Sequence, residues 1–133
     1  MSQSSAAEKS TPPRKPTKAE LALLGVLWQH GPATARQVFE HAQAARPEAN
    51  QATILRQLQI MHTDGLLTRD ESARTHVYAA AQPQAKLQTN LLKDFIQRAF
   101  SGSGKELIMA ALKEHVSDKE RAEIQKFLHG DKK

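Results

Sequence analysis

The first regular pattern in the chain is a row of apolar residues at helical spacing after residue 16. The apolar residues recur every three or four positions and so share one helix face; they are Leu21, Leu24, Leu27 and Trp28. Thr17 and Glu20 occupy the N-cap and N3 positions of a capping box, and Gly31-Pro32 stops the helix. The pattern therefore predicts a helix over residues 17–30.

A second capping box, at residues 34–37, begins a shorter helix. Val38, Phe39 and Ala42 carry its apolar face inward. The helix is expected to end before Arg46-Pro47, because the residue before a proline disfavours the helical conformation. A short polar connection then leads to the next helical stretch.

The third stretch, NQATILRQLQIMHTD at residues 50–64, has one apolar and one polar side. Ile54, Leu58 and Met61 form the apolar stripe, while Asn50 is a suitable N-cap and Gly65 a suitable stop. The polar face carries Gln51, Thr53, Arg56, Gln59 and, at its edge, Gln57. Amides, hydroxyls and a guanidinium can bond base edges and phosphate oxygens, so we interpret this stretch as a DNA-recognition helix. A helix that is only solvated on one side has a similar composition.

After this helix the apolar period changes from helical to alternating. Residues 66–69 and 75–78 are short β-prone runs, and the charged residues 70–74 form a turn between them. Three helices followed by a hairpin are the winged-helix arrangement, in which the hairpin commonly rests on the DNA backbone or in the minor groove. Arg74 at the tip is suitably placed for such a contact, although a solvated turn arginine is the alternative. Val77 and Tyr78 are better explained by packing on the helices.

Beyond Gln82-Pro83 the pattern is wholly helical. Capping boxes at residues 103–106 and 117–120 each open a further helix. The winged domain has no room for the apolar side chains of Leu91, Phe95, Phe100, Leu107, Ile108, Leu112, Phe127 and Leu128. Helices too few to enclose their apolar faces usually bury them against a second copy of the chain, so residues 83–130 are the predicted dimerisation domain. Packing back onto the same chain is the alternative.

The predicted fold class is therefore mainly α with a small β wing: a winged helix-turn-helix over residues 17–82 followed by three helices. Residues 1–16 are rich in Ser, Ala, Pro and Lys without an apolar period, so they are expected to be a disordered arm. Arg14, Lys15 and Lys18 stand at its junction with the fold, where the arm could follow a phosphate backbone or only solubilise the chain. Residues 131–133 form a basic tail. The candidate DNA contacts are Thr34, Arg36, Asn50, Gln51, Thr53, Arg56, Gln57, Arg74 and His76.

Composition limits the other classes of protein. The formal net charge of +5 and the pI near 9.7 permit a polyanionic partner but do not prove one. No apolar run reaches the length of a membrane span and the first residues lack a signal-peptide pattern, so we expect a cytoplasmic protein without membrane insertion. The absence of cysteine excludes disulfides, thiolate metal sites and cysteine nucleophiles.

Catalytic and cofactor chemistry has little support in the sequence. The 6 histidines include no pair three or four residues apart, so no metal-ligand cluster is readable. Residues 101–105, SGSGK, are similar to a phosphate loop, but Glu106 stands where Ser or Thr should bind magnesium, and a helix cap explains the segment. We therefore expect no catalytic residues, no metal and no cofactor.

Four segments together resemble the penicillinase-repressor family over nearly all of residues 17–129. They are ELALLGVLWQHGPATARQVFEHA, ATILRQLQIMHTDGLLTRD, RTHVY and FSGSGKELIMAALKEHVSDKE. The resemblance implies a homodimeric transcriptional repressor with winged-helix heads on a palindromic double-stranded DNA operator. It also implies a three-helix, domain-exchanged tail that clasps the partner chain. A winged-helix module that binds another protein is the alternative from a different class.

Two departures from the family concern the signal that releases the repressor. Members induced by β-lactams have an Asn-Phe pair in the first tail helix that is cut when a membrane metalloprotease sensor is triggered, and the aligned residues here are Ala110-Ala111. Copper-sensing members carry C-terminal Cys-x-Cys pairs, and this chain has no cysteine. The resemblance suggests a membrane-bound sensor protease or another antirepressor as a partner, but neither known trigger carries over.

Overall fold

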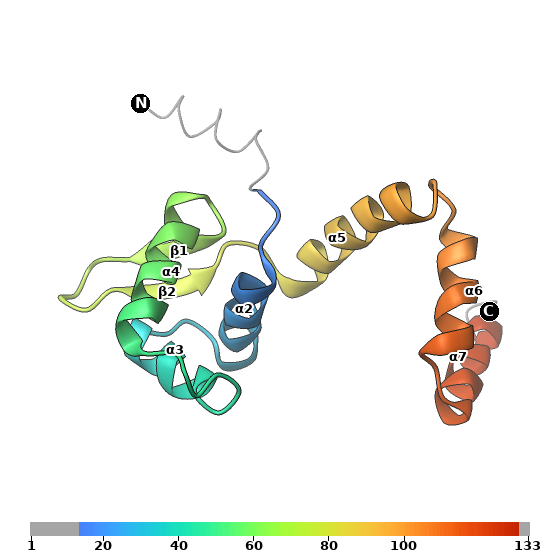
Figure 1. Cartoon of the computed structure of the whole chain (residues 1–133), viewed down its shortest axis with the longest axis horizontal. Helices are drawn as coiled ribbons and strands as arrows, with labels where there is room; N and C mark the ends of the chain where they lie inside the picture. The colour runs from blue at the N-terminus through green and yellow to red at the C-terminus, as the bar shows by residue number, and fades with distance from the viewer. Residues whose placement is uncertain (1–13, 131–133) are drawn as a thin grey trace. The chain divides into compact units, whose positions relative to one another are not determined.

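Residues 14–130 are described by the computed structural model of the chain, shown in Figure 1. The chain divides into two compact units, unit 1 up to Leu87 and unit 2 from Gln88. The predicted arm at residues 1–13 and the predicted tail at residues 131–133 lie outside the described residues. The predicted domain boundary at Gln82-Pro83 precedes the division between the units, because Leu87 packs against the core of unit 1.

Unit 1 contains three helices and a hairpin in the predicted order. They are α2 (Lys18–His30), α3 (Ala35–Ala42), α4 (Gln51–Thr63), β1 (Leu67–Asp70) and β2 (Val77–Ala80). Unit 2 contains most of α5 (Gln84–Ala99), then α6 (Gly104–Glu114) and α7 (Asp118–Gly130). The predicted fold class, a winged helix followed by a helical C-terminal part, is confirmed.

Local capping determines where these helices begin. The Thr17 hydroxyl accepts a hydrogen bond from the Glu20 amide, and the Glu20 carboxylate accepts one from the Thr17 amide, which completes the predicted capping box. Thr34 and Gln37 form the second box in the same way. The side chain of Asn50 accepts from the Thr53 amide at 2.8 Å and caps α4. All three predicted starts are confirmed.

The core of unit 1 lies where α2, α3 and α4 meet the base of the hairpin. Its buried apolar residues are Leu23, Leu24, Leu27, Ala33, Val38, Ala42, Ile54, Leu58, Met61, Leu66, Leu67 and Tyr78. Leu21 and Trp28, which the periodicity placed on the buried face, are only half-buried and pack at its edge. The Trp28 indole donates a hydrogen bond to the Gln82 carbonyl oxygen at 3.0 Å, which ties the end of the hairpin segment to α2.

The strands of the hairpin differ from the prediction in their bounds. The strands pair antiparallel from Leu67 opposite Ala80 to Asp70 opposite Val77, so both begin later than expected. Ala33 and Tyr78 exchange two backbone hydrogen bonds, of 2.9 and 2.8 Å, and thereby add a short third segment beside β2. This long-range bridge places Tyr78 in the core at 1% exposure, where it can align β2.

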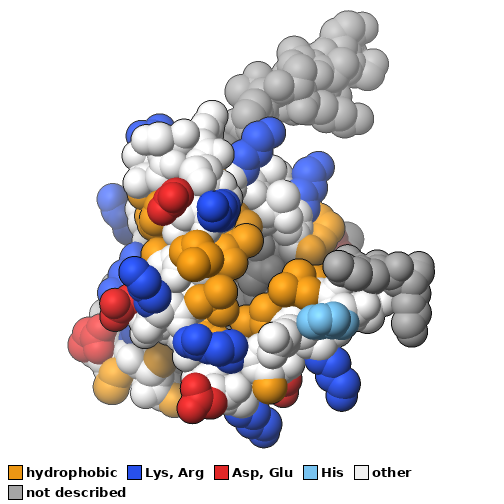
Figure 2. All heavy atoms as spheres, turned by 90° about the vertical axis from the view of Figure 1, so that its right-hand side faces the viewer, with side chains coloured by type: hydrophobic (Ala, Val, Ile, Leu, Met, Phe, Trp, Pro, Cys, Tyr) orange, Lys and Arg blue, Asp and Glu red, His pale blue; other side chains and the backbone are white. Residues whose placement is uncertain are grey.

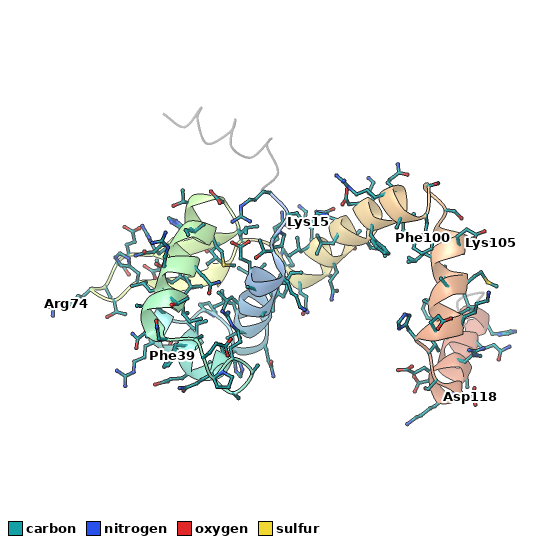
Figure 3. All side chains as sticks on the ribbon, viewed as in Figure 1. Lys15, Phe39, Arg74, Phe100, Lys105 and Asp118 are labelled. Atoms are coloured by element: carbon teal, nitrogen blue, oxygen red, sulfur yellow. The ribbon has the colours of Figure 1, made fainter. Side chains whose placement is uncertain are left out.

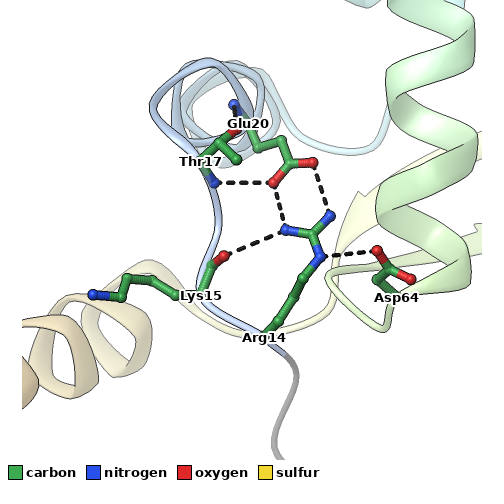
Figure 4. A network of polar contacts seen from close by, with 5 residues as sticks. All are labelled: Arg14, Lys15, Thr17, Glu20 and Asp64. Carbon is green, nitrogen blue, oxygen red and sulfur yellow. Dashed lines mark hydrogen bonds and ion pairs between the residues drawn. The ribbon is translucent and has the colours of Figure 1, made fainter.

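The ordered contacts of unit 1 begin before Thr17, which corrects the predicted extent of the arm. The Arg14 guanidinium donates to both Glu20 carboxylate oxygens, at 2.7 and 2.9 Å, and to an Asp64 carboxylate oxygen at 2.8 Å (Figure 4). Pro16 is buried. Arg14 therefore joins the start of α2 to the C-cap of α4 and belongs to the folded unit.

Unit 2 is held by local contacts rather than by a core of its own. None of the residues of α5, α6 or α7 is buried. Ser103 caps α6 through the Glu106 amide, and Ser117 and Glu120 complete a capping box before α7. The Arg121 guanidinium donates to the Leu112 carbonyl oxygen at 2.6 Å and so links α7 to the end of α6.

The Arg14 bridge should make the stability of unit 1 depend on pH. Hydrogen bonds from Arg14, with a further one from the Thr17 amide, lower the pKa of Glu20 from 4.5 to about 2 against the opposing effect of burial. Because the pKa is lower in the folded state, this stability is complete above pH 4.5 and is lost as the pH falls toward 2. Glu20→Gln should remove it, at a cost of about 2 kcal/mol near neutral pH after discounting for the partly exposed Arg14.

Urea unfolding of the wild type and of Glu20→Gln between about pH 2 and pH 7 measures the difference in their free energy of unfolding. The wild-type advantage over Glu20→Gln should shrink as the pH falls, whereas Glu114→Gln, at an exposed position of α6, should track the wild type. An advantage that is the same at both ends of the range would contradict the assignment.

Candidate nucleic-acid interface

The packing of α4 determines which of its residues face outward. Ile54, Leu58 and Met61 are each 0% exposed, so one side of α4 is held in the core. The opposite side presents a line of exposed residues at spacings of four, three and four, Ala52, Arg56, Gln59 and Thr63, called the outer line below. No carboxylate occurs between Ala49 and Thr63.

The outer line changes the predicted set of contacts. It includes Arg56, as expected, but also Ala52, Gln59 and Thr63, which were not among the candidate DNA contacts. The position of Gln59 on the polar face is visible in the periodicity of the sequence. Ala52 was not predicted because its side chain has no polar group. It is identified only by its position opposite the buried stripe.

The N-terminal end of α4 carries three further candidates. Gln51 and Thr53 are exposed there, where the unpaired amides of the first turn give a partial positive charge. Asn50 is exposed as well, but its side-chain oxygen Oδ1 accepts the capping hydrogen bond from the Thr53 amide. This end of α4 is suited to phosphate, while the outer line is suited to base edges.

Gln57 was predicted as a DNA contact at the edge of the polar face, but it is not on the exposed surface. It is half-buried, and its Oε1 atom is buried without a hydrogen-bond partner among the described residues. A side chain whose acceptor is turned inward cannot present that acceptor to a base.

Apart from the half-buried Arg46, the arginines of unit 1 in residues 14–87 fall into paired and unpaired groups. Arg14 pairs with Glu20 and Asp64, Arg36 pairs with Glu40 at 3.2 Å, and Arg69 pairs with Glu71 at 2.6 Å. Arg56 and Arg74 are exposed and form no ion pair within residues 14–130. Their full charge is therefore available to an anion.

The hairpin carries Arg74 at its tip, as Figure 3 shows. The two carboxylates near it are already engaged: the pKa of Glu71 is lowered by its hydrogen bond from Arg69, and that of Asp70 by hydrogen bonds from Ser72. Arg69 also lies 6.0 Å from the centroid of the Tyr78 ring. Arg74 is consequently the free cation of the wing, and His76, the other predicted wing contact, is half-buried beside β2.

The two candidates on α3 have local structural functions. Thr34 is half-buried and is the N-cap of α3, where its hydroxyl accepts from the Gln37 amide. Arg36 is exposed in the first turn, with its guanidinium on Glu40 one turn later. An exposed pair of this kind is weak, so Arg36 can exchange Glu40 for a phosphate, but Thr34 has less freedom.

Neither a metal-binding cluster nor a membrane-spanning helix is present in the described part of the chain. In residues 14–130 no group of three or more His, Cys, Asp or Glu side chains is arranged to hold a metal ion. The rings of His30 and His41 stack with centroids 3.7 Å apart, so their faces rather than their nitrogens meet. No helix over the same range has the length and apolar character to cross a membrane.

Comparison with known proteins identifies the family. The family model described as penicillinase repressor matches residues 16–130, which covers α2–α7. The chain belongs to the penicillinase repressor family. It is therefore a transcriptional repressor of a family of winged-helix regulators that are not enzymes.

Two further comparisons concern solved structures and curated proteins. The chain is similar to the solution structure of apo-NmtR, with 22% sequence identity, coverage of 89% of this chain and 83% of that chain, and a TM-score of 0.44. No curated protein matches the chain.

Removal of the Asn50 cap tests how α4 is held in place. Asn50→Ala should lower the free energy of unfolding by about 1 kcal/mol, because the Thr53 amide loses its acceptor. Asn50→Asp should keep the stability, since a carboxylate oxygen accepts the same bond at a helix N-terminus. Thermal or urea unfolding measures both, with the exposed neighbour Gln51→Ala as control. Equal stability of Asn50→Ala and the wild type would show that the cap contributes nothing.

Proposed function

We propose that the chain represses transcription by binding a palindromic DNA operator as a homodimer, with α4 in the major groove and the hairpin on the sugar-phosphate backbone. The observation that carries the proposal is the distribution of arginines in unit 1. Among the exposed arginines of unit 1 in residues 14–87, those without an ion pair are Arg56 on the outer line and Arg74 at the wing tip. Those are the two elements that a winged helix applies to DNA.

The composition of α4 supports a contact with DNA rather than with an acidic or apolar protein surface. Its 13 residues extend ~20 Å, enough to lie across a major groove. The exposed side presents one cation, amides and hydroxyls, and no carboxylate that phosphates would repel. Arg56 and Gln59 project from the middle of the helix, where base edges are within reach.

A second candidate function rests on two apolar side chains of α4. Leu55 and Ile60 are 38% and 42% exposed, and an exposed apolar pair also occurs where a winged helix binds another protein. Both flank the outer line, where thymine methyl groups are an equally apolar partner. Binding to duplex DNA that survives an excess of nonspecific competitor distinguishes the two functions.

The proposed dimer accounts for the state of unit 2. Large apolar side chains are exposed on its helices: Leu92, Phe95, Ile108, Met109, Phe127 and Leu128. Figure 2 shows hydrophobic side chains gathered at the surface, with Lys and Arg side chains around them. Helices with this much apolar surface and no buried residue are stabilised by a second copy that covers it.

The residues predicted for the dimer contact divide by exposure. Phe95, Ile108, Phe127 and Leu128 are between 51% and 66% exposed and would form the centre of the contact. The half-buried residues of the predicted set are Leu91, Phe100, Leu107 and Leu112. The rings of Phe95 and Phe100 meet edge to face with centroids 5.7 Å apart, which fixes the aromatic surface at the end of α5.

A partner, either a membrane-bound sensor protease or another antirepressor, releases the repressor from DNA. Cleavage between Ala110 and Ala111 is not expected. Both are half-buried in the interior of α6, and alanine favours the helix that a protease would have to open.

Two arginine substitutions test DNA binding by different signatures. Arg56→Ala should weaken specific binding by about 1–3 kcal/mol, because a base contact is lost. Arg74→Ala should weaken all duplexes similarly and lower the salt slope of binding by about one per site contacted. Fluorescence anisotropy at several salt concentrations measures both, and Arg98→Ala, a paired arginine of α5, is the control. Wild-type affinity in both variants with the fold intact would refute the docking.

Substitutions on the apolar surface of unit 2 test the dimer. Phe95→Asp and Phe127→Asp should shift the chain toward monomer, because each places a carboxylate in the contact. Operator affinity should fall with it, since two linked heads gain effective concentration that one head lacks. Analytical ultracentrifugation measures the association, and Lys93→Ala, exposed on α5, should remain dimeric. A wild-type chain that sediments as a monomer at micromolar concentration would reject the homodimer.

A further inference from the structure

We propose that the outer line of α4 reads a defined base pattern, in which Arg56 reads a guanine, Gln59 reads an adenine on one side of it, and Ala52 contacts a thymine methyl group on the other. This assignment rests on the proposed function, because it requires α4 to lie in the major groove. It adds the kind of half-site that this chain selects and the residues that select it.

The geometry of the outer line restricts the spacing of the bases. Residues at 52, 56, 59 and 63 share the side opposite the buried Ile54, Leu58 and Met61. Along the helix axis, Ala52 and Arg56 are ~6 Å apart and Arg56 and Gln59 are ~4.5 Å apart. Base pairs rise by ~3.4 Å. Each neighbour of Arg56 therefore faces a pair one or two steps from the guanine.

Arg56 is the only group in this line suited to a guanine. Guanine presents two acceptors in the major groove, O6 and N7, and a guanidinium donates to both at once. Arg56 is exposed and has no competing carboxylate within residues 14–130. Asp64, the next carboxylate along the chain, is held by Arg14 at 2.8 Å and cannot draw Arg56 away.

The amide of Gln59 can both donate and accept a hydrogen bond, whereas the Arg56 guanidinium only donates. Adenine presents an acceptor at N7 and a donor at N6, and one amide can satisfy both. Gln59 is exposed with a free amide, whereas Gln57 turns its acceptor inward and Gln51 lies off the outer line at the helix start. Of the glutamines of α4, Gln59 is thus the one placed to read a base.

Apolar groups define the remaining positions. Ala52 presents a methyl group on the outer line, and Leu55 and Ile60 flank that line with exposures of 38% and 42%. The thymine methyl group is the apolar feature of the major groove. A carboxylate, which would accept from cytosine N4, is missing from residues 50–63, so a G·C pair is read from its guanine.

The test uses the full-length chain and a pool of random duplexes. Bound sequences from the wild type should show two dyad-related half-sites, each with a G·C pair and, one or two steps away, an A·T pair. Gln59→Glu should replace adenine by cytosine at that pair, because a carboxylate accepts from cytosine N4, and should weaken the original site roughly 5- to 150-fold. Arg56→Ala should relax the guanine position alone.

A matched control makes the same chemical change away from the interface. Gln29→Glu lies on the exposed side of α2 and should leave both the affinity and the base preference unchanged. Circular dichroism of each variant verifies the fold, and the exposure of Gln59 and Arg56 makes unfolding by these changes unexpected.

The outcomes separate this inference from the function on which it rests. A wild type that selects no sequence from the pool would overturn both. A wild type that selects dyad-related sites, with Gln59→Glu retaining adenine or Arg56→Ala retaining guanine, would overturn the base assignment and leave operator binding intact. A cytosine preference in Gln59→Glu at one symmetric pair of positions would establish it.

Discussion

Burial of three side chains of α4 is the constraint on which the rest of unit 1 depends. Ile54, Leu58 and Met61 are completely excluded from solvent among residues of α2, α3 and the hairpin base. Each such side chain contributes roughly 1.5–3 kcal/mol by leaving water, which is enough to fix the rotation of a 13-residue helix about its axis. Once that rotation is fixed, so is the set of residues facing outward. The apolar residues of α4 thus determine which polar ones can meet a ligand.

The two units of the chain differ in how much of their apolar surface is buried. Unit 1 buries a cluster of apolar side chains between three helices and a small sheet. Unit 2 has three helical segments whose apolar faces remain accessible, and its contacts include helix caps, the Arg98–Asp94 pair and a hydrogen bond from Arg121 to the end of α6. In the proposed homodimer its folding free energy would depend on association, which would couple the concentration of the chain to its state of assembly.

Much of unit 1 could be predicted because its signals are local. A cap such as Thr17 or Asn50 acts within three residues, and the spacing of Ile54, Leu58 and Met61 directly gives the buried side of α4. The features that were missed depend on distant partners. The bridge beside β2 joins Ala33 to Tyr78, and the position of Arg14 depends on Asp64, fifty residues away. Gln57 stands at the edge of the stripe, where periodicity does not decide between inside and outside.

The Arg14 bridge has a consequence for how the folded unit can be delimited. Glu20 and Asp64 share one guanidinium, which comes from the segment before the first helix. A chain cut at Thr17, where the apolar period begins, would retain both carboxylates and lose the cation between them. Glu20 at the start of α2 and Asp64 at the C-cap of α4 would then lose the cation that they share, and the charge of Asp64 would act on both α4 and any phosphate brought near it. A form of unit 1 that keeps this charge balance therefore begins no later than Arg14, three residues before the apolar period of its sequence.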